Sequence, residues 1–261
     1  MNSLLQTAIT AALQAGKAIL DIYDDPASDF EIEHKADHSP LTIADRVSNE
    51  IILKQLKNTP YPVISEENKA TAYAIRKQWQ TVWIVDPLDG TKEFIKRNGE
   101  FTVNIALVYG GRPALGVKKI LYYGTIRNGA YRADHPEYSP DMDFDALENQ
   151  ARRLPLDRED PVYTVVASRS HMSSDTKNFI DELKKEHGEV KLTSIGSSIK
   201  ICLVAEGTAD IYPRFASTME WDTAAGHAIA KAAGKELYHQ DGCTPLAYNK
   251  EDLLNPWFIV K

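Results

Sequence analysis

The chain of 261 residues is long enough to bury the core of one large domain or of two small ones. Its content of 43% hydrophobic and 26% charged residues is ordinary for a soluble globular protein and argues against a disordered chain. The formal net charge of -7 argues against a protein that holds nucleic acid on a broad basic face. A small anionic substrate fits that charge only if metal ions or local Lys and Arg residues offset the carboxylates.

The N-terminal segment predicts an amphipathic helix. Apolar residues from Leu5 to Leu20 recur at helical spacing, and Asp24, Asp25 and Pro26 end the pattern after about five or six turns. The segment lacks the basic start of a secretion signal, and the chain has no run of about 18 apolar residues. We therefore expect a cytoplasmic protein without a transmembrane segment. Peripheral association with the cytoplasmic side of the inner membrane is the alternative to packing this helix in the core.

The following segments predict short strands and one helix. They are a strand at residues 30–33, a helix at 42–55 that opens at Thr42, and strands at 63–65 and 82–85. From residue 101 onward, apolar stretches separated by turn residues predict an antiparallel meander, in which Asn128 and Gly129 form a hairpin turn.

The second half of the chain alternates strands with helices. Strands are predicted at 162–168, 190–193, 209–213, 235–239 and 257–260, and helices at 174–187, 197–207 and 221–234. Residues 135–160 lack periodicity, so we predict that they connect an N-terminal half, 1–134, to a C-terminal half, 161–261. The pattern indicates an α/β fold of the α+β layered kind, with an antiparallel N-terminal sheet and a smaller mixed C-terminal sheet. Neither cysteine has metal-ligand spacing, and we expect both to be reduced.

Residues 83–91 (WIVDPLDGT) place two carboxylates, Asp86 and Asp89, at the end of a predicted strand. Pro87 and Gly90 favour a turn, and acidic turns of this composition are common in proteins where they have no further role. A metal site is the alternative interpretation. The D-x-x-D spacing differs from the D-x-D spacing of phosphatases with an aspartyl nucleophile, which argues against a covalent aspartyl phosphate.

Two distant carboxylates strengthen the metal interpretation. Glu66 also follows an apolar strand, and Asp222 opens a helix of small residues. Four converging carboxylates would repel one another unless divalent cations were bound, and oxygen ligands, including the Leu88 carbonyl, favour Mg²⁺ or Mn²⁺ over Zn²⁺. The backbone N–H groups of Gly90 and Thr91 would serve a phosphate, and the Thr91 hydroxyl would position a water molecule.

The motifs taken together resemble a known family. Residues 64–67 (ISEE), 83–91 and 220–226 (EWDTAAG) resemble the inositol monophosphatase superfamily of Mg²⁺-dependent, lithium-sensitive phosphatases. Within it, four stretches are similar to the CysQ-type 3'(2'),5'-bisphosphate nucleotidases: 35–45 (KADHSPLTIAD), 168–171 (SRSH), 196–207 (GSSIKICLVAEG) and 212–214 (YPR). The resemblance covers nearly the whole chain. It implies the inositol monophosphatase/sugar phosphatase-like fold and hydrolysis of the 3'-phosphate of adenosine 3',5'-bisphosphate (PAP), a by-product of sulfate assimilation, to AMP.

The resemblance implies two or three metal ions. Glu66, Asp86 and the Leu88 carbonyl would bind one Mg²⁺, and Asp86, Asp89 and Asp222 would bind a second. Glu66 would contribute to a third, and Mn²⁺ is a substitute ion.

The resemblance also implies catalytic and binding roles. Asp45 and Thr91 would activate the attacking water, with Glu66 as a further catalytic residue, although Asp45 also suits a capping box after Thr42. Lys35 and Asp37 would belong to a loop that closes over the metals. The implied substrate-binding residues are Glu66, Leu88, Asp89, Gly90, Thr91, His171, Ser197, Lys200, Arg214 and Asp222. Without the resemblance, His171 and Arg214 could be solvated loop residues and Lys200 an exposed lysine of an amphipathic helix.

Three functions stay open at this point. The first is a PAP phosphatase, which could also accept 3'-phosphoadenosine 5'-phosphosulfate. The second is an inositol or sugar-phosphate monophosphatase, and the third is a non-catalytic sensor of metal or nucleotide. Asp45 and Thr91 favour an enzyme because sensing needs no water activation. We expect a small-molecule nucleotide substrate, no nucleic-acid partner, and a monomer or homodimer.

Overall fold

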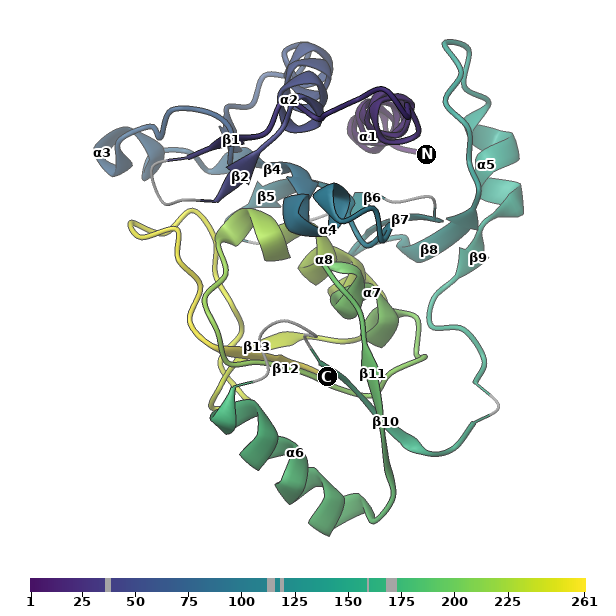
Figure 1. Cartoon of the computed structure of the whole chain (residues 1–261), viewed down its shortest axis with the longest axis vertical. Helices are drawn as coiled ribbons and strands as arrows, with labels where there is room; N and C mark the ends of the chain where they lie inside the picture. Colours follow the sequence, from purple (N-terminus) through teal and green to yellow (C-terminus); the bar gives the residue numbers. More distant parts are fainter. Residues whose placement is uncertain (36–38, 112–115, 118–119, 159, 168–172) are drawn as a thin grey trace.

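Helices and sheets alternate in layers in this computed structural model (Figure 1). It describes residues 1–35, 39–111, 116–117, 120–158, 160–167 and 173–261. Helices α1 (Ser3–Tyr23) and α2 (Ile43–Leu56) cover one face of a large sheet. Helices α7 (Ile199–Ala205) and α8 (Glu220–Ala232) lie between that sheet and the C-terminal strands, and α6 (Ser174–His187) covers the far side. The predicted layered α/β fold is confirmed.

The large sheet has seven strands in the order β3-β4-β5-β6-β7-β8-β9. They are β3 (Val63–Ser65), β4 (Thr81–Asp89), β5 (Thr102–Tyr109), β6 (Gly116–Val117), β7 (Ile120–Thr125), β8 (Gly129–Asp134) and β9 (Arg152–Arg153). Neighbouring strands are antiparallel as predicted, except that β3 and β4 are parallel. Trp83 and Val85 face α1 and α2, whereas Val82 and Ile84 face α8. Because both faces are covered, β4 is a continuous apolar run.

The C-terminal strands are shorter and mixed in direction. Strand β10 (Tyr163–Ala167) pairs in parallel with β11 (Val190–Ser194). Strands β12 (Tyr212–Arg214), β14 (Phe258–Val260) and β13 (Leu237–His239) form an antiparallel sheet in that order. A parallel bridge between Val165 and Ile211 connects the two groups.

The N-terminal helix packs in the core. Its apolar face includes Leu5, Ile9 and Ile19, which are buried in the cluster beneath the large sheet. Amphipathic spacing therefore reflects core packing here. Within the described residues, no helix combines the length and apolar character that crossing a bilayer would require.

Two sequence-based predictions need correction. The strand predicted at 30–33 is wrong, because Phe30 and Glu31 have φ angles of 65° and 46°. This left-handed turn buries the Phe30 ring against Phe94, with ring centroids 4.7 Å apart. Only β1 (Glu33–His34) is extended there, and it pairs with β2 (Pro40–Leu41).

The second correction concerns residues 135–160, which contain unpredicted regular structure. Helix α5 (Phe144–Gln150) begins after Asp143, whose side chain accepts hydrogen bonds from two backbone N–H groups. Strand β9 then pairs with β8 at the edge of the large sheet. The helix was not predicted because Asp143, its N-cap, is one of several acidic residues in this stretch and does not stand out as a helix start. The division of the chain into two halves stays a prediction.

Candidate active site

The DPLD stretch lies on an irregular end of β4. In the pairing of β4 with β5, Asp86 is opposite Asn104 and the next pair is Asp89 opposite Thr102. Two residues of β4, Pro87 and Leu88, therefore lie opposite a single residue of β5, Val103. This extra residue is a β-bulge, and Pro87, which lacks an N–H donor, lies within it. The strand was predicted to end at Asp86, but it continues to Asp89, and the bulge redirects the chain.

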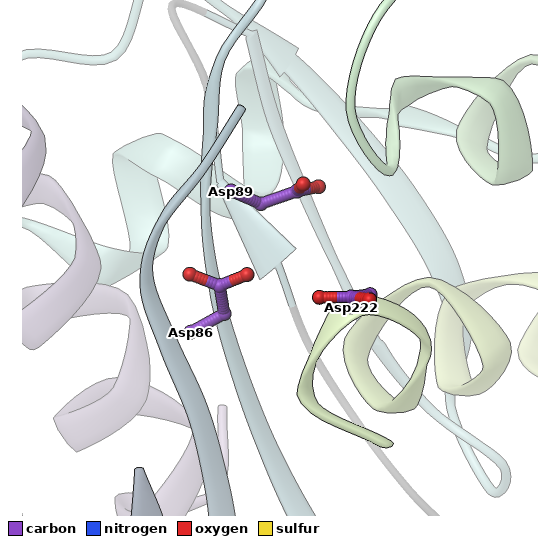
Figure 2. Close-up of side chains that lie close together, drawn as sticks. All are labelled: Asp86, Asp89 and Asp222. Carbon is purple, nitrogen blue, oxygen red and sulfur yellow. The ribbon is translucent and has the colours of Figure 1, made fainter. Parts of the chain in front are cut away.

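Three aspartates converge beside this bulge. Asp86 and Asp89 come from β4, and Asp222 reaches toward them from the first turn of α8 (Figure 2). One carboxylate oxygen of each lies within 4.8 Å of the others. Asp222 Oδ2 accepts a hydrogen bond of 2.7 Å from the Met219 N–H, which fixes its direction. The structure therefore brings together two segments that are far apart in the sequence.

The three carboxylates are electrostatically unfavourable on their own. Burial and the charges of Glu66, Asp89 and Asp222 raise the pKa of Asp86 well above its usual range. Burial and the charge of Asp89 likewise raise the pKa of Asp222. A divalent cation would offset this repulsion, and an oxygen-only donor set suits a hard cation such as Mg²⁺. The residues present therefore fit a metal centre.

Glu66 lies next to this cluster, but its carboxylate is paired with a lysine. Lys35 Nζ lies 2.7 Å from Glu66 Oε1 and 2.6 Å from Glu67 Oε1. Burial raises the pKa of Glu66, although the Lys35 charge opposes that shift. Lys35, the residue after β1, thus contacts the edge of the site. Asp37, expected in the same loop, lies outside the described residues.

A hydrogen-bonded chain joins Asp45 to the bulge. Asp45 Oδ2 accepts from the Thr42 N–H at 2.7 Å and from Thr42 Oγ1 at 2.6 Å, so the predicted capping box is present. Asp45 Oδ1 accepts from Thr91 Oγ1 at 3.1 Å, and the same hydroxyl lies 3.2 Å from the Leu88 carbonyl oxygen. Burial raises the pKa of Asp45. One oxygen of Asp45 therefore caps α2, while the other faces Thr91.

A cavity of about 400 Å³ opens beside the acidic cluster. Its wall includes six of the predicted binding residues: Asp89, Gly90, Ser197, Lys200, Arg214 and Asp222. Among the described residues, Glu66, Leu88 and Thr91 belong instead to the surroundings of the carboxylates. His171 lies outside the described residues.

The cavity wall carries buried cationic and polar groups. Lys200 is 5% exposed, so the alternative of an exposed surface lysine is wrong. Its Nζ donates to the Ser197 carbonyl oxygen at 2.6 Å, and burial lowers the pKa of Lys200 to about 8. Within the described part of the chain, Arg214 Nε and Ser197 Oγ are buried without a hydrogen-bond partner. Buried polar groups are rarely left unpaired, so these atoms suit a polar ligand.

Sequence reasoning missed the residues that hold Asp89. Asp89 Oδ2 accepts from the Ser198 N–H at 2.5 Å, from Thr102 Oγ1 at 3.2 Å and from Asn104 Nδ2 at 3.4 Å. Thr102 and Asn104 are two residues apart on β5 and therefore share a face. Two polar residues with this spacing in an apolar strand were the available signal.

Comparisons with known proteins show which family the chain resembles over its whole length. A model of the inositol monophosphatase family matches residues 1–257. The chain is 45% identical over 260 residues to the 3'(2'),5'-bisphosphate nucleotidase CysQ of Escherichia coli O157:H7, across 98% of this chain and 99% of the relative. A crystal structure of CysQ from Bacteroides thetaiotaomicron, described as a bacterial member of the inositol monophosphatase family, is 57% identical. Its TM-score is 0.92, and the match covers 99% of this chain and 97% of that one.

More distant structures share the fold alone. Inositol monophosphatase-II from Staphylococcus aureus MSSA476 matches with a TM-score of 0.71 at 19% identity, over 99% of this chain and 88% of that one.

Proposed function

The chain belongs to the inositol monophosphatase family, and we propose that it is a metal-dependent 3'(2'),5'-bisphosphate nucleotidase that hydrolyses PAP to AMP and phosphate. The observation that carries this proposal is the cavity beside the acidic cluster, in which buried Lys200 and partly buried Arg214 face space large enough for a small ligand. Full-length similarity to nucleotidases supports the same substrate. The reaction would remove PAP formed during sulfate assimilation.

Mg²⁺ is the proposed ion, in two or three sites. Asp86, Asp89 and Asp222 would hold it, with the Leu88 carbonyl and Glu66 as additional ligands. When bound, Mg²⁺ would polarise the phosphate and stabilise negative charge on the leaving ribose oxygen. The carboxylates contribute by keeping their oxygens directed at one small volume, through the bulge in β4 and the first turn of α8.

Asp45 and Thr91 are the proposed water-activating residues. A water molecule that donates a hydrogen bond to Thr91 Oγ1 would be aligned for attack on phosphorus. As the water oxygen forms its bond to phosphorus, the water would give a proton to Thr91 Oγ1, and the Thr91 hydroxyl would give its own proton to Asp45 Oδ1. The bonds from Thr42 occupy Asp45 Oδ2, so that Oδ1 is the oxygen presented to Thr91. The bond between phosphorus and the ribose 3'-oxygen breaks, and that oxygen leaves with the electron pair and takes a proton from solvent to become the 3'-hydroxyl of AMP.

Substrate choice would depend on the cavity. PAP carries a 5'-phosphate in addition to the scissile group, whereas inositol 1-phosphate has no second anion. Lys200 and Arg214 therefore offer charge-assisted hydrogen bonds that only the nucleotide can use. This difference favours the nucleotidase over the inositol or sugar-phosphate monophosphatase.

A comparison of substrates tests the proposed function. We expect kcat/KM for PAP to exceed that for inositol 1-phosphate by at least about a hundredfold, since pairing buried Lys200 and partly buried Arg214 with a second phosphate is worth several kcal/mol. Arg214→Met should reduce this ratio, whereas Arg152→Met, at an exposed position on β9, should not. The measurement is phosphate release under identical metal concentrations, with 3'-phosphoadenosine 5'-phosphosulfate as a third substrate. Equal or reversed preference would contradict the nucleotidase assignment.

The pH dependence of KM tests the role of Lys200. Because burial lowers the pKa of Lys200 to about 8, its ammonium is present below that pH and is lost above it. We therefore expect KM for PAP to rise as the pH increases through about 8, where the 5'-phosphate is already fully ionised. Lys200→Met should have a high KM at pH 7 and no rise of this kind. A wild-type KM that is constant to pH 10 would argue against a contact between Lys200 and the phosphate.

A further inference from the structure

The loop before α7 is tied to the N-terminal half of the chain by two carboxylates. Residues 195–198 connect β11 to α7. The Gly196 N–H donates to Glu100 Oε2 at 2.7 Å, and the Ser198 N–H donates to Asp89 Oδ2 at 2.5 Å. Asp89 belongs to the acidic cluster already described, whereas Glu100 lies ahead of β5 and has no part in the proposed chemistry. Backbone N–H bonds to charged acceptors are among the stronger hydrogen bonds in proteins.

Close packing accompanies these hydrogen bonds. A Cβ added at Gly196 would lie 3.0 Å from three Glu100 atoms, including Cβ and Oε2. A Cβ added at Gly90 would lie 2.9 Å from the Glu100 carbonyl oxygen and 3.5 Å from Ser197 Cβ. Glu100 is therefore placed between two glycine-containing turns, which approach it more closely than other residues would allow.

The tethered loop holds Ser197 in an unusual conformation. Ser197 has a φ of 50°, in the left-handed region that serine seldom adopts. Its carbonyl oxygen accepts from Lys200 Nζ at 2.6 Å. Among the residues that the structure describes, its hydroxyl is buried and has no partner, and it lines the cavity. A residue in such a conformation persists only when its surroundings determine it.

We propose that Glu100 is a positioning residue for substrate preference. By accepting the Gly196 N–H, it keeps the Ser197 hydroxyl and the adjacent Lys200 at the cavity wall, where they recognise the 5'-phosphate. The proposal rests on the proposed nucleotidase function. Glu100 would act on binding of the distal phosphate and leave hydrolysis of the 3'-phosphate to the acidic cluster.

Three substitutions separate the hydrogen bond from the charge. Glu100→Asp keeps the charge but withdraws the acceptor, Glu100→Gln removes the charge but keeps an acceptor oxygen, and Glu100→Ala removes both. The assay compares PAP with 3'-AMP, which lacks the 5'-phosphate. We expect Glu100→Ala and Glu100→Asp to raise KM for PAP about tenfold and to leave kcat unchanged. A tenfold change in KM corresponds to the loss of about one hydrogen bond to a charged group. KM for 3'-AMP should stay at the wild-type value, and Glu100→Gln, which keeps a neutral acceptor, should have a KM for PAP between those of the wild type and Glu100→Ala.

Several outcomes would overturn this proposal. An equal loss with PAP and 3'-AMP would show a general structural role, and Glu100→Asp with wild-type KM would show that the hydrogen bond is unimportant. Glu100→Gln with the same defect as Glu100→Ala would point to charge instead. Thermal unfolding of each variant establishes that it is folded, and the Asp and Gln variants carry the test if the Ala variant is not. Failure of the nucleotidase assignment is distinguishable, because wild-type enzyme would then show no preference for PAP over inositol 1-phosphate.

Discussion

Asp86→Asn is expected to lower kcat for PAP by at least about a thousandfold, since metal ions contribute several kcal/mol of charge stabilisation to phosphoryl transfer. Burial and the charges of Glu66, Asp89 and Asp222 raise the pKa of Asp86, and its carboxylate lies within 4.8 Å of those of Asp89 and Asp222. Its replacement removes a ligand from both of the principal proposed metal sites. Phosphate release over a range of Mg²⁺ concentrations measures the loss.

The fold should survive this substitution. Asp86 Oδ1 accepts the Leu88 N–H at 3.0 Å, a bond that the amide oxygen of the substituted asparagine side chain can also accept. Removing one of several neighbouring negative charges should leave the thermal midpoint of the metal-free protein unchanged or raise it. Binding of Mn²⁺, followed by electron paramagnetic resonance, should weaken in parallel with activity. Asp24→Asn, at an exposed position after α1, is the control. Full activity in Asp86→Asn would remove Asp86 from the metal site.

Asp45→Asn is expected to lower kcat by about 10²- to 10⁴-fold with little change in KM, the range for loss of a general base. The amide oxygen of the substituted asparagine side chain can still accept from the Thr42 N–H, so the start of α2 should stay intact. Thr91→Val should produce a loss of similar size because it breaks the same chain between water and Asp45. The double variant should be little worse than either single one, since the two residues act as a unit.

The capping role of Asp45 requires its own control. Thr42→Ala removes the hydroxyl that donates to Asp45 Oδ2 at 2.6 Å, and loss of such a cap costs about 0.5–2 kcal/mol of stability. We expect this variant to unfold at a lower temperature but to retain most of its kcat. If Thr42→Ala and Asp45→Asn lost activity and stability in equal measure, capping alone would explain Asp45.

Most helices and strands could be predicted from the sequence because their patterns are local. Helix α6 and strand β3 have the predicted bounds, residues 174–187 and 63–65. The failures occurred where tertiary contacts override local pattern. Phe30 leaves the extended conformation to bury its ring, and β9 exists because the edge of β8 accepts it.

The acidic members of the candidate site were also predictable, since carboxylates at the ends of apolar strands are conspicuous. The supporting residues were not. Ser198 reaches Asp89 through its backbone N–H, a group that every residue except proline possesses. Glu100 was indistinguishable in the sequence from other glutamates on the surface. Lys200 had the spacing of an exposed helical lysine, yet the cavity wall buries it.

Local geometry in this protein follows from short stretches of sequence: the capping box at Thr42, the turn that Gly90 permits and the bulge that suits Pro87. These features depend on bond rotation and on hydrogen bonds between near neighbours. The proximity of Asp222 to Asp86 and Asp89, and the hydrogen bond between Thr91 and the Asp45 side chain that also caps α2, follow from tertiary packing instead. Such meetings depend on how α8 and α2 pack against the large sheet. That packing is set by apolar burial summed over whole layers, and no short stretch of sequence encodes it.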